Sequence, residues 1–336
     1  MLYTLSACFN EGIEVMILDR PNPLGDYIGG PIMDQKYLSF LGTMVGEPLF
    51  SGMTIAEKAH YIKARGSDFN VPCNCGSKNC AHGIFCSAAK LKKGKLTVIK
   101  MKNWNRKKTL TQLGLYKSTS PLPLSPSIQN VASIFEYAVI SLATLTNRSF
   151  IGFLQGHTSE QMPQRSFKYF LTATPIAQVL SKIKQVYPGA LSGITLTTVK
   201  EKNQDYLDLT VSDIKKTTPA LFGLVLIAQA QEWVPECDWL AFEKASPSSP
   251  GTEQRSPTST VRDLAKLPLA QQKILRKAKW DRLSEAQREQ FQKHMGDGEM
   301  VRKLFDGDSI DVVHFRNKWS REATHFRNKT KKYYLY

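Results

Sequence analysis

A short apolar run followed at once by a proline-rich loop constrains the fold more than any other feature of this chain. Residues 14–18 read Glu-Val-Met-Ile-Leu, and residues 19–23 read Asp-Arg-Pro-Asn-Pro. An amphipathic segment over residues 3–11 precedes the run, and Gly12 stands where a helix would end. A helix, a buried strand and a loop in this order are typical of an α/β domain with parallel strands. Ligands of such sheets bind beyond the carboxyl ends of the strands, so loop 19–31 is the first candidate site.

Patterns elsewhere in the chain predict further helices and strands. Thr54 and Glu57 form a capping box, which marks the start of a helix. A Ser-, Pro- and Thr-rich stretch over residues 246–260 predicts a flexible loop. With 336 residues, the chain is long enough for two domains of ordinary size. Helices are expected near residues 128–145, 172–187, 219–233, 264–279, 284–295 and 309–329, and strands near residues 96–101, 191–199 and 206–211.

The formal net charge of +16 needs a physical reason. Ten Lys or Arg residues and no acid lie between Lys90 and Lys117. Such a patch could dock nucleic acid, an acidic glycan or anionic lipid, or it could consist of solvated helix faces. No nucleic-acid motif accompanies the charge, so no nucleic-acid partner is predicted.

The sequence shows neither a membrane span nor a secretory signal. No apolar run approaches the roughly 20 residues that a membrane-spanning helix needs. The first ten residues lack the basic region and the long apolar region of a signal peptide. We therefore expect a cytoplasmic protein without a membrane partner.

Residue types that ligate metals cluster between the helix that starts at Thr54 and the strand near residues 96–101. Four thiolate or imidazole ligands could hold a structural zinc there, with no open position for catalysis. The spacing lacks the paired Cys-x₂-Cys knuckles of common zinc sites, so free thiols or a redox-sensitive loop are alternatives. No catalytic cofactor is predicted, because no Gly-x-Gly-x-x-Gly follows a strand. The cluster consists of Cys73, Cys75, Cys80, His82 and Cys86.

Five short segments, spread over almost the whole chain, carry a family resemblance. They read Leu-Asp-Arg-Pro-Asn-Pro-Leu-Gly, Gly-Met-Thr-Ile-Ala-Glu, Leu-Thr-Val-Ile-Lys-Met-Lys-Asn-Trp-Asn-Arg, Ser-Pro-Ser-Ile and Lys-Lys-Tyr-Tyr-Leu-Tyr. They occupy residues 18–25, 52–57, 96–106, 125–128 and 331–336. In these residues, and in their order, the chain resembles the DUF1343 family, which includes the exo-β-N-acetylmuramidases.

The resemblance implies both a fold and a reaction. The fold is α/β: an incomplete Rossmann-like parallel-sheet domain over residues 1–150, then a smaller C-terminal α/β domain over residues 151–336. A Cys-rich insertion, outside the resemblance, is expected at about residues 66–90. The implied reaction is exo-acting hydrolysis that releases N-acetylmuramic acid from peptidoglycan fragments in cell-wall recycling. Such hydrolysis uses an acid that protonates the leaving oxygen and usually a second carboxylate.

The chain also departs from the family pattern in its chemistry. Gly29 stands where the family reads Val-Glu-Gly-Pro, and residues 143–147 read Ala-Thr-Leu-Thr-Asn where the family reads Glu-Gly-Thr-Asn. Neither Gly nor Thr can replace a carboxylic acid in proton transfer. An inactive relative that binds muropeptide sugars or a partner chain is therefore an alternative function. A basic module that binds polyanions is a second alternative.

The family also carries residues before the point that corresponds to Met1. They would supply the first strands of the sheet. Without them the sheet would have an exposed edge and an apolar face. Either a separate polypeptide supplies these strands, or the gene has decayed, or the start has been placed too late.

The strand end and the resemblance together give the candidate site residues. Asp19 is the candidate catalytic residue, able to accept sugar hydroxyls or act as a base. The alternative is a structural pair with Arg20. Asn22, between two prolines, could aim its amide at an acetamido group or form an Asx-turn. The predicted substrate-binding residues are Tyr3, Arg20, Asn22, Ser125 and Asn147.

Overall fold

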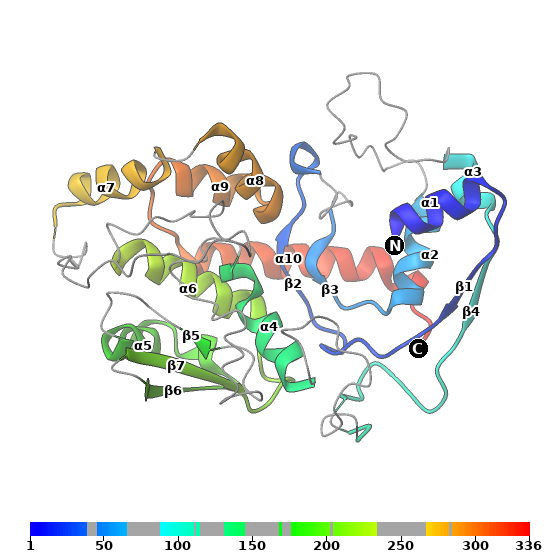
Figure 1. The fold of residues 1–336 in the computed structure, drawn as a ribbon, viewed down its shortest axis with the longest axis horizontal. Coiled ribbons are helices and arrows are strands. Elements are labelled where there is room, and N and C mark those ends of the chain that lie inside the picture. The colour runs from blue at the N-terminus through cyan, green and yellow to red at the C-terminus, as the bar shows by residue number, and fades with distance from the viewer. Residues whose placement is uncertain are drawn as a thin grey trace, which may run out of the picture. The chain divides into compact units, whose positions relative to one another are not determined.

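The chain forms two compact units, drawn in Figure 1. The first comprises Met1–Leu115 and Asn317–Tyr336, and the second comprises Tyr116–Arg316. The last helix of the chain thus returns its final residues to the first unit. The predicted domains over residues 1–150 and 151–336 stay a prediction. The computed structural model describes residues 1–38, 46–65, 88–110, 112–114, 131–144, 168–169, 176–201, 204–233, 267–281 and 284–336.

Helices enclose the core of the first unit. Leu5 and Phe9 of α1, together with Tyr61 and Ile62 of α2, are almost fully buried there, and Phe326 of the last helix joins them. Figure 1 shows α1, α2 and α3 close together near the two chain ends. The helices of this unit are α1 (Leu2–Asn10), α2 (Ile55–Arg65), α3 (Ala88–Lys93), the end of α10 (Val312–Thr330) and the short 3₁₀ turns η1 (Gln35–Tyr37) and η5 (Lys331–Tyr333).

A pair of parallel strands lies beside these helices. Strands β1 (Val15–Leu18) and β4 (Leu96–Ile99) run side by side, with Val15 opposite Leu96 and Leu18 opposite Ile99. Side chains alternate between the faces of a strand. One face of the pair therefore packs on the core through Ile17, which is 7% exposed.

A second pair of strands was not predicted. Strands β2 (Ile28–Ile32) and β3 (Pro48–Ser51) are antiparallel, with Ile28 opposite Ser51 and an irregular register between Gly29 and Ile32. The Gly-Gly-Pro sequence within β2 gives no strand signal, because Gly and Pro are depleted in strands. Gly52 follows β3 with φ +62°, and a Cβ there would lie 2.9 Å from the carbonyl oxygen of Asp26. This close approach of two chain segments requires glycine.

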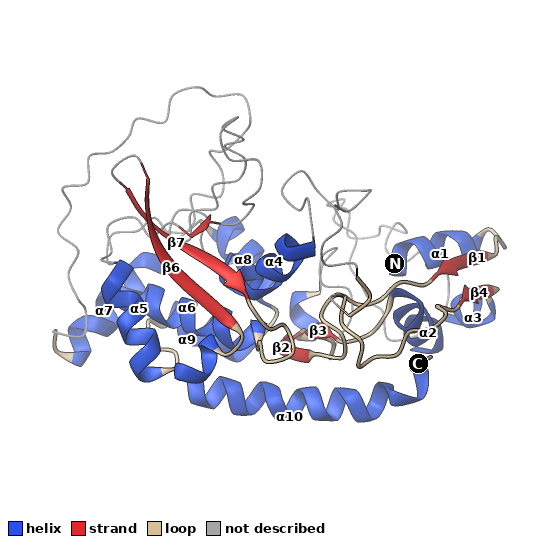
Figure 2. Ribbon diagram, turned by 90° about the horizontal axis from the view of Figure 1, so that it is seen from below, coloured by secondary structure: helices blue, strands red, loops and turns tan. Residues whose placement is uncertain are grey.

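The second unit combines an antiparallel sheet with helices. Its strand order is β5-β7-β6, and Figure 2 shows β6 and β7 as long neighbouring arrows. Trp280, Phe291 and Phe305 form an aromatic cluster with ring centroids 4.9–5.8 Å apart. Asp297 caps the following helix by accepting hydrogen bonds from two of its first amides. The elements are α4 (Val131–Thr144), β5 (Lys168–Tyr169), α5 (Ile176–Val186), η3 (Pro188–Leu191), β6 (Ile194–Glu201), β7 (Gln204–Val211), α6 (Pro219–Trp233), α7 (Leu269–Asp281), α8 (Glu285–Met295), α9 (Gly298–Phe305) and the start of α10.

The mixture of helices with a parallel strand pair agrees with the predicted α/β class. The helix over residues 3–11 and the strand over residues 14–18 are confirmed as α1 and β1, and Gly12 has φ +71° as a helix stop. The Rossmann-like topology and the α/β class of a separate C-terminal domain stay predictions. In the part of the chain that the structure describes, no helix is long and apolar enough to cross a membrane.

Candidate functional site

Asp19 follows β1 directly and is buried, with 9% of its surface exposed. Its Oδ1 accepts a hydrogen bond from the backbone N–H of Ala56 at 3.1 Å. Its Oδ2 accepts from Thr54 Oγ1 at 2.7 Å and from the hydroxyl of Tyr336 at 3.0 Å. Ala56 lies in the first turn of α2, where backbone N–H groups have no partner within the helix. Asp19 therefore ties the end of β1 to the start of α2.

A second buried carboxylate, Glu57, organises the same helix start. Its Oε2 accepts from the backbone N–H of Thr54 at 2.9 Å, and Thr54 Oγ1 accepts from the Glu57 N–H at 3.3 Å, so the predicted capping box is confirmed. Glu57 also pairs with Arg106 at 2.5 Å, and its side chain is fully buried while that of Arg106 is 12% exposed. Its Oε1 accepts from the backbone N–H of Leu335 at 2.9 Å.

The C-terminal segment closes over both carboxylates. The Arg106 guanidinium lies over the ring of Tyr334, 3.8 Å from its centroid. Tyr336 packs edge-on against Trp104, and its hydroxyl accepts from the Met101 N–H at 2.8 Å while donating to Asp19. Burial raises the pKa of Tyr336, with the carboxylate of Asp19 acting in the same direction. The phenol therefore stays protonated at neutral pH and remains a donor.

The other predicted site residues have different surroundings. Asn22 donates to the carbonyl oxygen of Met53 at 2.9 Å. It accepts from the Leu24 N–H at 2.9 Å, and this contact is the Asx-turn that the sequence offers as its alternative role. Arg20 is exposed, and no ion pair joins it to Asp19 in the described ranges. Tyr3 packs against the core of the first unit.

Several predictions lie outside the described residues. They concern Ser125 and Asn147 as sugar contacts, and the Cys73, Cys75, Cys80, His82 and Cys86 cluster as a structural zinc site. Both stay predictions. Within the described ranges no group of three or more His, Cys, Asp or Glu side chains could hold a metal ion.

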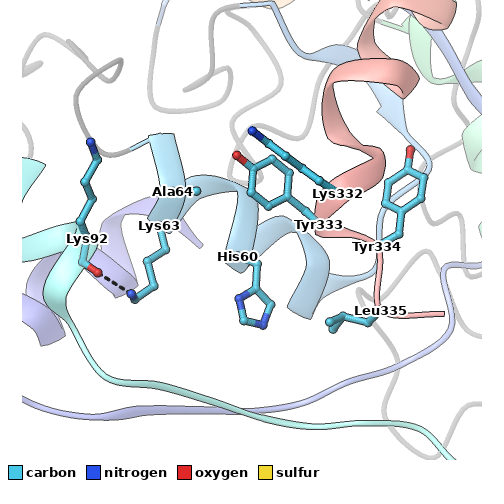
Figure 3. A pocket seen from close by; sticks show the side chains of 8 residues that line it. All are labelled: His60, Lys63, Ala64, Lys92, Lys332, Tyr333, Tyr334 and Leu335. Carbon is cyan, nitrogen blue, oxygen red and sulfur yellow. Dashed lines mark hydrogen bonds between the residues drawn. The ribbon is translucent and has the colours of Figure 1, made fainter.

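A basic pocket of about 370 Å³ lies between α2, α3 and the C-terminal segment. Figure 3 shows His60, Lys63 and Ala64 projecting from α2, with Lys332 to Leu335 on the facing segment. Lys92 of α3 completes the lining, and its carbonyl oxygen accepts a hydrogen bond from the Lys63 ammonium. No lining residue is acidic. Among the described residues, no ion pair neutralises Lys63, Lys92 or Lys332.

His60 responds to this environment. Burial lowers its pKa, and the positive charges of Lys63 and Lys100 lower it further, while the carboxylate of Asp19 opposes them. His60 is therefore neutral at physiological pH. This pocket is not apparent from the sequence, because its residues come from three distant segments that only the fold brings together.

Residues 1–131 match the family model described as exo-beta-N-acetylmuramidase NamZ, N-terminal. This stretch contains β1, α2, β4, Asp19, Glu57 and Arg106. In this stretch the chain is similar to the NamZ, or DUF1343, family.

Two known proteins show the same similarity. The chain is 29% identical over 243 residues to the peptidoglycan beta-N-acetylmuramidase NamZ of Bacillus subtilis (strain 168), a region that covers 70% of this chain and 50% of the relative. The chain thus spans half the length of this curated NamZ protein. The crystal structure of a DUF1343 family protein from Bacteroides fragilis NCTC 9343 superposes with a TM-score of 0.61 at 19% identity, covering 99% of this chain and 68% of that one. This likeness supports the α/β fold.

The buried pair of Glu57 and Arg106 should dominate the stability of this NamZ relative's first unit. Replacing Glu57 by Gln leaves the Arg106 charge buried without its partner, which costs about 3–5 kcal/mol when a buried pair is broken. We expect the free energy of unfolding of Glu57→Gln to fall by about 3 kcal/mol in urea titrations.

Glu14→Gln is the matched control. Glu14 pairs with Lys95 at 2.8 Å, but this pair lies at the surface, where solvent screens the attraction. The same change of Glu to Gln should leave its unfolding midpoint nearly unchanged. Equal losses in the two variants would contradict the central role of Glu57.

Proposed function

We propose that the chain binds the N-acetylmuramic acid end of peptidoglycan fragments, and that the basic pocket holds the carboxylate of that sugar. The observation that carries the proposal is a pocket lined by three lysines and no acid, whose α2 and α3 walls lie within the residues that match the NamZ model. N-acetylmuramic acid differs from N-acetylglucosamine by a lactyl ether that carries a carboxylate. A binding site for this sugar therefore needs a cationic region that a site for N-acetylglucosamine does not.

The electrostatics of the pocket favour an anionic ligand. Lys63, Lys92 and Lys332 bring positive charge to the lining, which attracts a carboxylate. An ammonium group donates strong hydrogen bonds to carboxylates. The sides of the Tyr333 and Tyr334 rings and Leu335 add apolar surface to the lining, which suits a sugar ring with its acetamido methyl group.

Hydrolysis is the second candidate function, and the similarity to NamZ favours it. It requires a carboxylic acid that can transfer a proton to the leaving oxygen. Asp19 is held by Thr54, Ala56 and Tyr336, and Glu57 is held by Thr54, Arg106 and Leu335. These contacts suit positioning of α2 better than proton transfer. The catalytic role of Asp19 stays a prediction.

Binding of two sugars tests the proposal directly. N-acetylmuramic acid should bind in isothermal titration calorimetry, and N-acetylglucosamine should bind at least about tenfold more weakly, since it lacks the group that pairs with the lysines. Lys332→Gln should weaken binding of N-acetylmuramic acid by about tenfold and leave that of N-acetylglucosamine unchanged.

Lys36→Gln is the control variant for this comparison. Lys36 is exposed, belongs to the same unit and lies near Asp34 at 3.8 Å, outside the pocket. Its substitution removes the same charge, so it reports any effect of net charge alone. Equal affinities for the two sugars would argue against the pocket as the carboxylate site. Equal losses in both variants would point to unspecific attraction of anions, as for a polyanion-binding module.

The pH dependence of binding should depend on His60. A bound carboxylate favours protonated His60, whereas the free pocket lowers its pKa. Affinity for N-acetylmuramic acid should therefore rise as the pH falls from 7 to about 5, where the sugar carboxylate is still ionised. His60→Gln should remove this rise. A rise that persists in His60→Gln would assign the titration to another group.

Hydrolysis can be measured with a disaccharide that carries N-acetylmuramic acid at its non-reducing end. We expect the chain alone to release no N-acetylmuramic acid, because both buried carboxylates are engaged by protein donors. Release that is lost in Asp19→Asn, with an unchanged circular dichroism spectrum, would contradict this expectation. It would give Asp19 the catalytic role predicted from the sequence.

A further inference from the structure

Helix α10 carries an internal repeat that the candidate functions leave unexplained. The sequence His-Phe-Arg-Asn-Lys occurs at residues 314–318 and again at residues 325–329. Both copies lie within α10, which Figure 2 shows as one long helix. Eleven residues make about three turns of an α-helix, so each residue of the second copy lies on the same face as its counterpart, roughly 16 Å further along.

The buried phenylalanines of the two copies fix which face of α10 points outward. Phe315 and Phe326 are 0% and 2% exposed. Asn317, Arg321 and Asn328, in contrast, are exposed. Their spacing of four and seven residues places them in one row along the helix, on the side away from the phenylalanines. This row presents amide and guanidinium groups.

Positive charge lies along both flanks of this row. Successive residues of an α-helix are roughly 100° apart, so the Arg before each asparagine and the Lys after it lie on opposite flanks. These flanking residues are Arg316, Lys318, Arg327 and Lys329. The only acid between residues 316 and 329 is Glu322. Within the described ranges, no ion pair neutralises Arg321, Arg327 or Lys329.

We propose that the exposed face of α10 binds in the major groove of double-stranded DNA, with the central row toward the base edges and the flanking cations toward the two phosphate backbones. The major groove is about 12 Å wide and admits an α-helix, whose diameter with side chains is about 10–12 Å. Arginine and asparagine pair there with guanine and adenine, and lysine and arginine bind the phosphates. The proposal does not rest on sugar binding in the basic pocket.

This arrangement of charge is not a known sequence motif, which is why the sequence alone predicts no nucleic-acid partner. It becomes apparent only when the structure shows that Phe315 and Phe326 are buried. The row and its two flanks follow from that orientation of the helix.

Two other polyanionic ligands fit this face less well. A helix that lies in a membrane surface needs apolar side chains on its lipid-facing side. Between Asn317 and Lys329, all of which the structure describes, no exposed residue is a large apolar one. Double-stranded RNA has a deep, narrow major groove that side chains cannot read. A helix with charge on both flanks of a polar row therefore fits B-form DNA better than either ligand.

Fluorescence anisotropy of a labelled DNA duplex of mixed sequence tests the proposal with the full chain. Binding should have a dissociation constant on the order of 10⁻⁵ M at physiological salt. The logarithm of the binding constant should fall linearly with the logarithm of the salt concentration, with a slope of about −3.6, because each of the four flanking cations contributes about −0.9. Arg321→Gln/Lys329→Gln should weaken binding at least about tenfold and make the slope shallower by about 1, since it removes one cation from the row and one from a flank.

Lys102→Gln/Lys107→Gln is the matched control. It also removes two exposed cations, but from the segment between Lys90 and Lys117, which carries ten basic residues and no acid. The affinity and the slope of this variant should stay nearly unchanged. Equal losses in the two double variants would overturn the proposal, because binding would then follow net charge alone.

A second variant and two other ligands complete the test. Asn328→Asp removes no cation but places a negative charge in the row, so it should weaken DNA binding at least about tenfold. Its melting temperature should be unchanged, because Asn328 is exposed. Duplex RNA and vesicles of phosphatidylglycerol should bind more weakly than the DNA. Equal or tighter binding of either ligand, full affinity of Asn328→Asp, or no DNA binding by the folded wild-type chain at low salt would overturn the proposal.

Discussion

Two buried carboxylates hold the first unit together. They are Asp19, which follows β1, and Glu57, which lies in the first turn of α2. Asp19 brings the end of β1 to the helix start, and Glu57 fixes Arg106 and the C-terminal segment there. Each buried charge is costly unless donors surround it, and here the donors come from the start of α2, from Arg106 and from the C-terminal segment. Strand, helix, loop and C-terminus are therefore mutually dependent. The basic pocket depends on the same contacts, because α2 forms one of its walls and the C-terminal segment forms another.

Local features of the fold could be predicted from the sequence, and distant contacts could not. The apolar run of β1, the stop at Gly12 and the Thr54–Glu57 capping box depend on neighbouring residues, and all three are present. The β2–β3 pair escaped prediction because Gly29 and Gly30 carry no strand signal. The role of Asp19 could only be stated as alternatives, since its donors Thr54 and Tyr336 lie 35 and 317 positions away. The residues that line the pocket could not be predicted either, because they too come from distant parts of the chain.

The candidate site residues fall into two groups. The side chains of the first group hold the protein backbone in place, and the charged groups of the second are available to bind a ligand. Asn22 and Asp19, the two most conspicuous polar residues of the Asp-Arg-Pro-Asn-Pro loop, both use their side-chain oxygens to hold protein backbone. A conspicuous loop motif can therefore shape a site without touching the ligand. The cationic groups of Lys92 and Lys332, in contrast, have no carboxylate partner among the described residues. They are the groups through which charge can select a ligand.

The position of Asp19 bears on how the candidate functions should be weighed. Ligand sites of open α/β sheets lie beyond the carboxyl ends of several adjacent strands, and the described part of this sheet has two. Asp19 lies at the carboxyl end of β1, and its oxygens are held by Thr54, Ala56 and Tyr336. The basic pocket is lined by other residues of the same unit. Proton transfer at the strand end and recognition of a sugar carboxylate would therefore depend on different side chains, and each can be tested without altering the other.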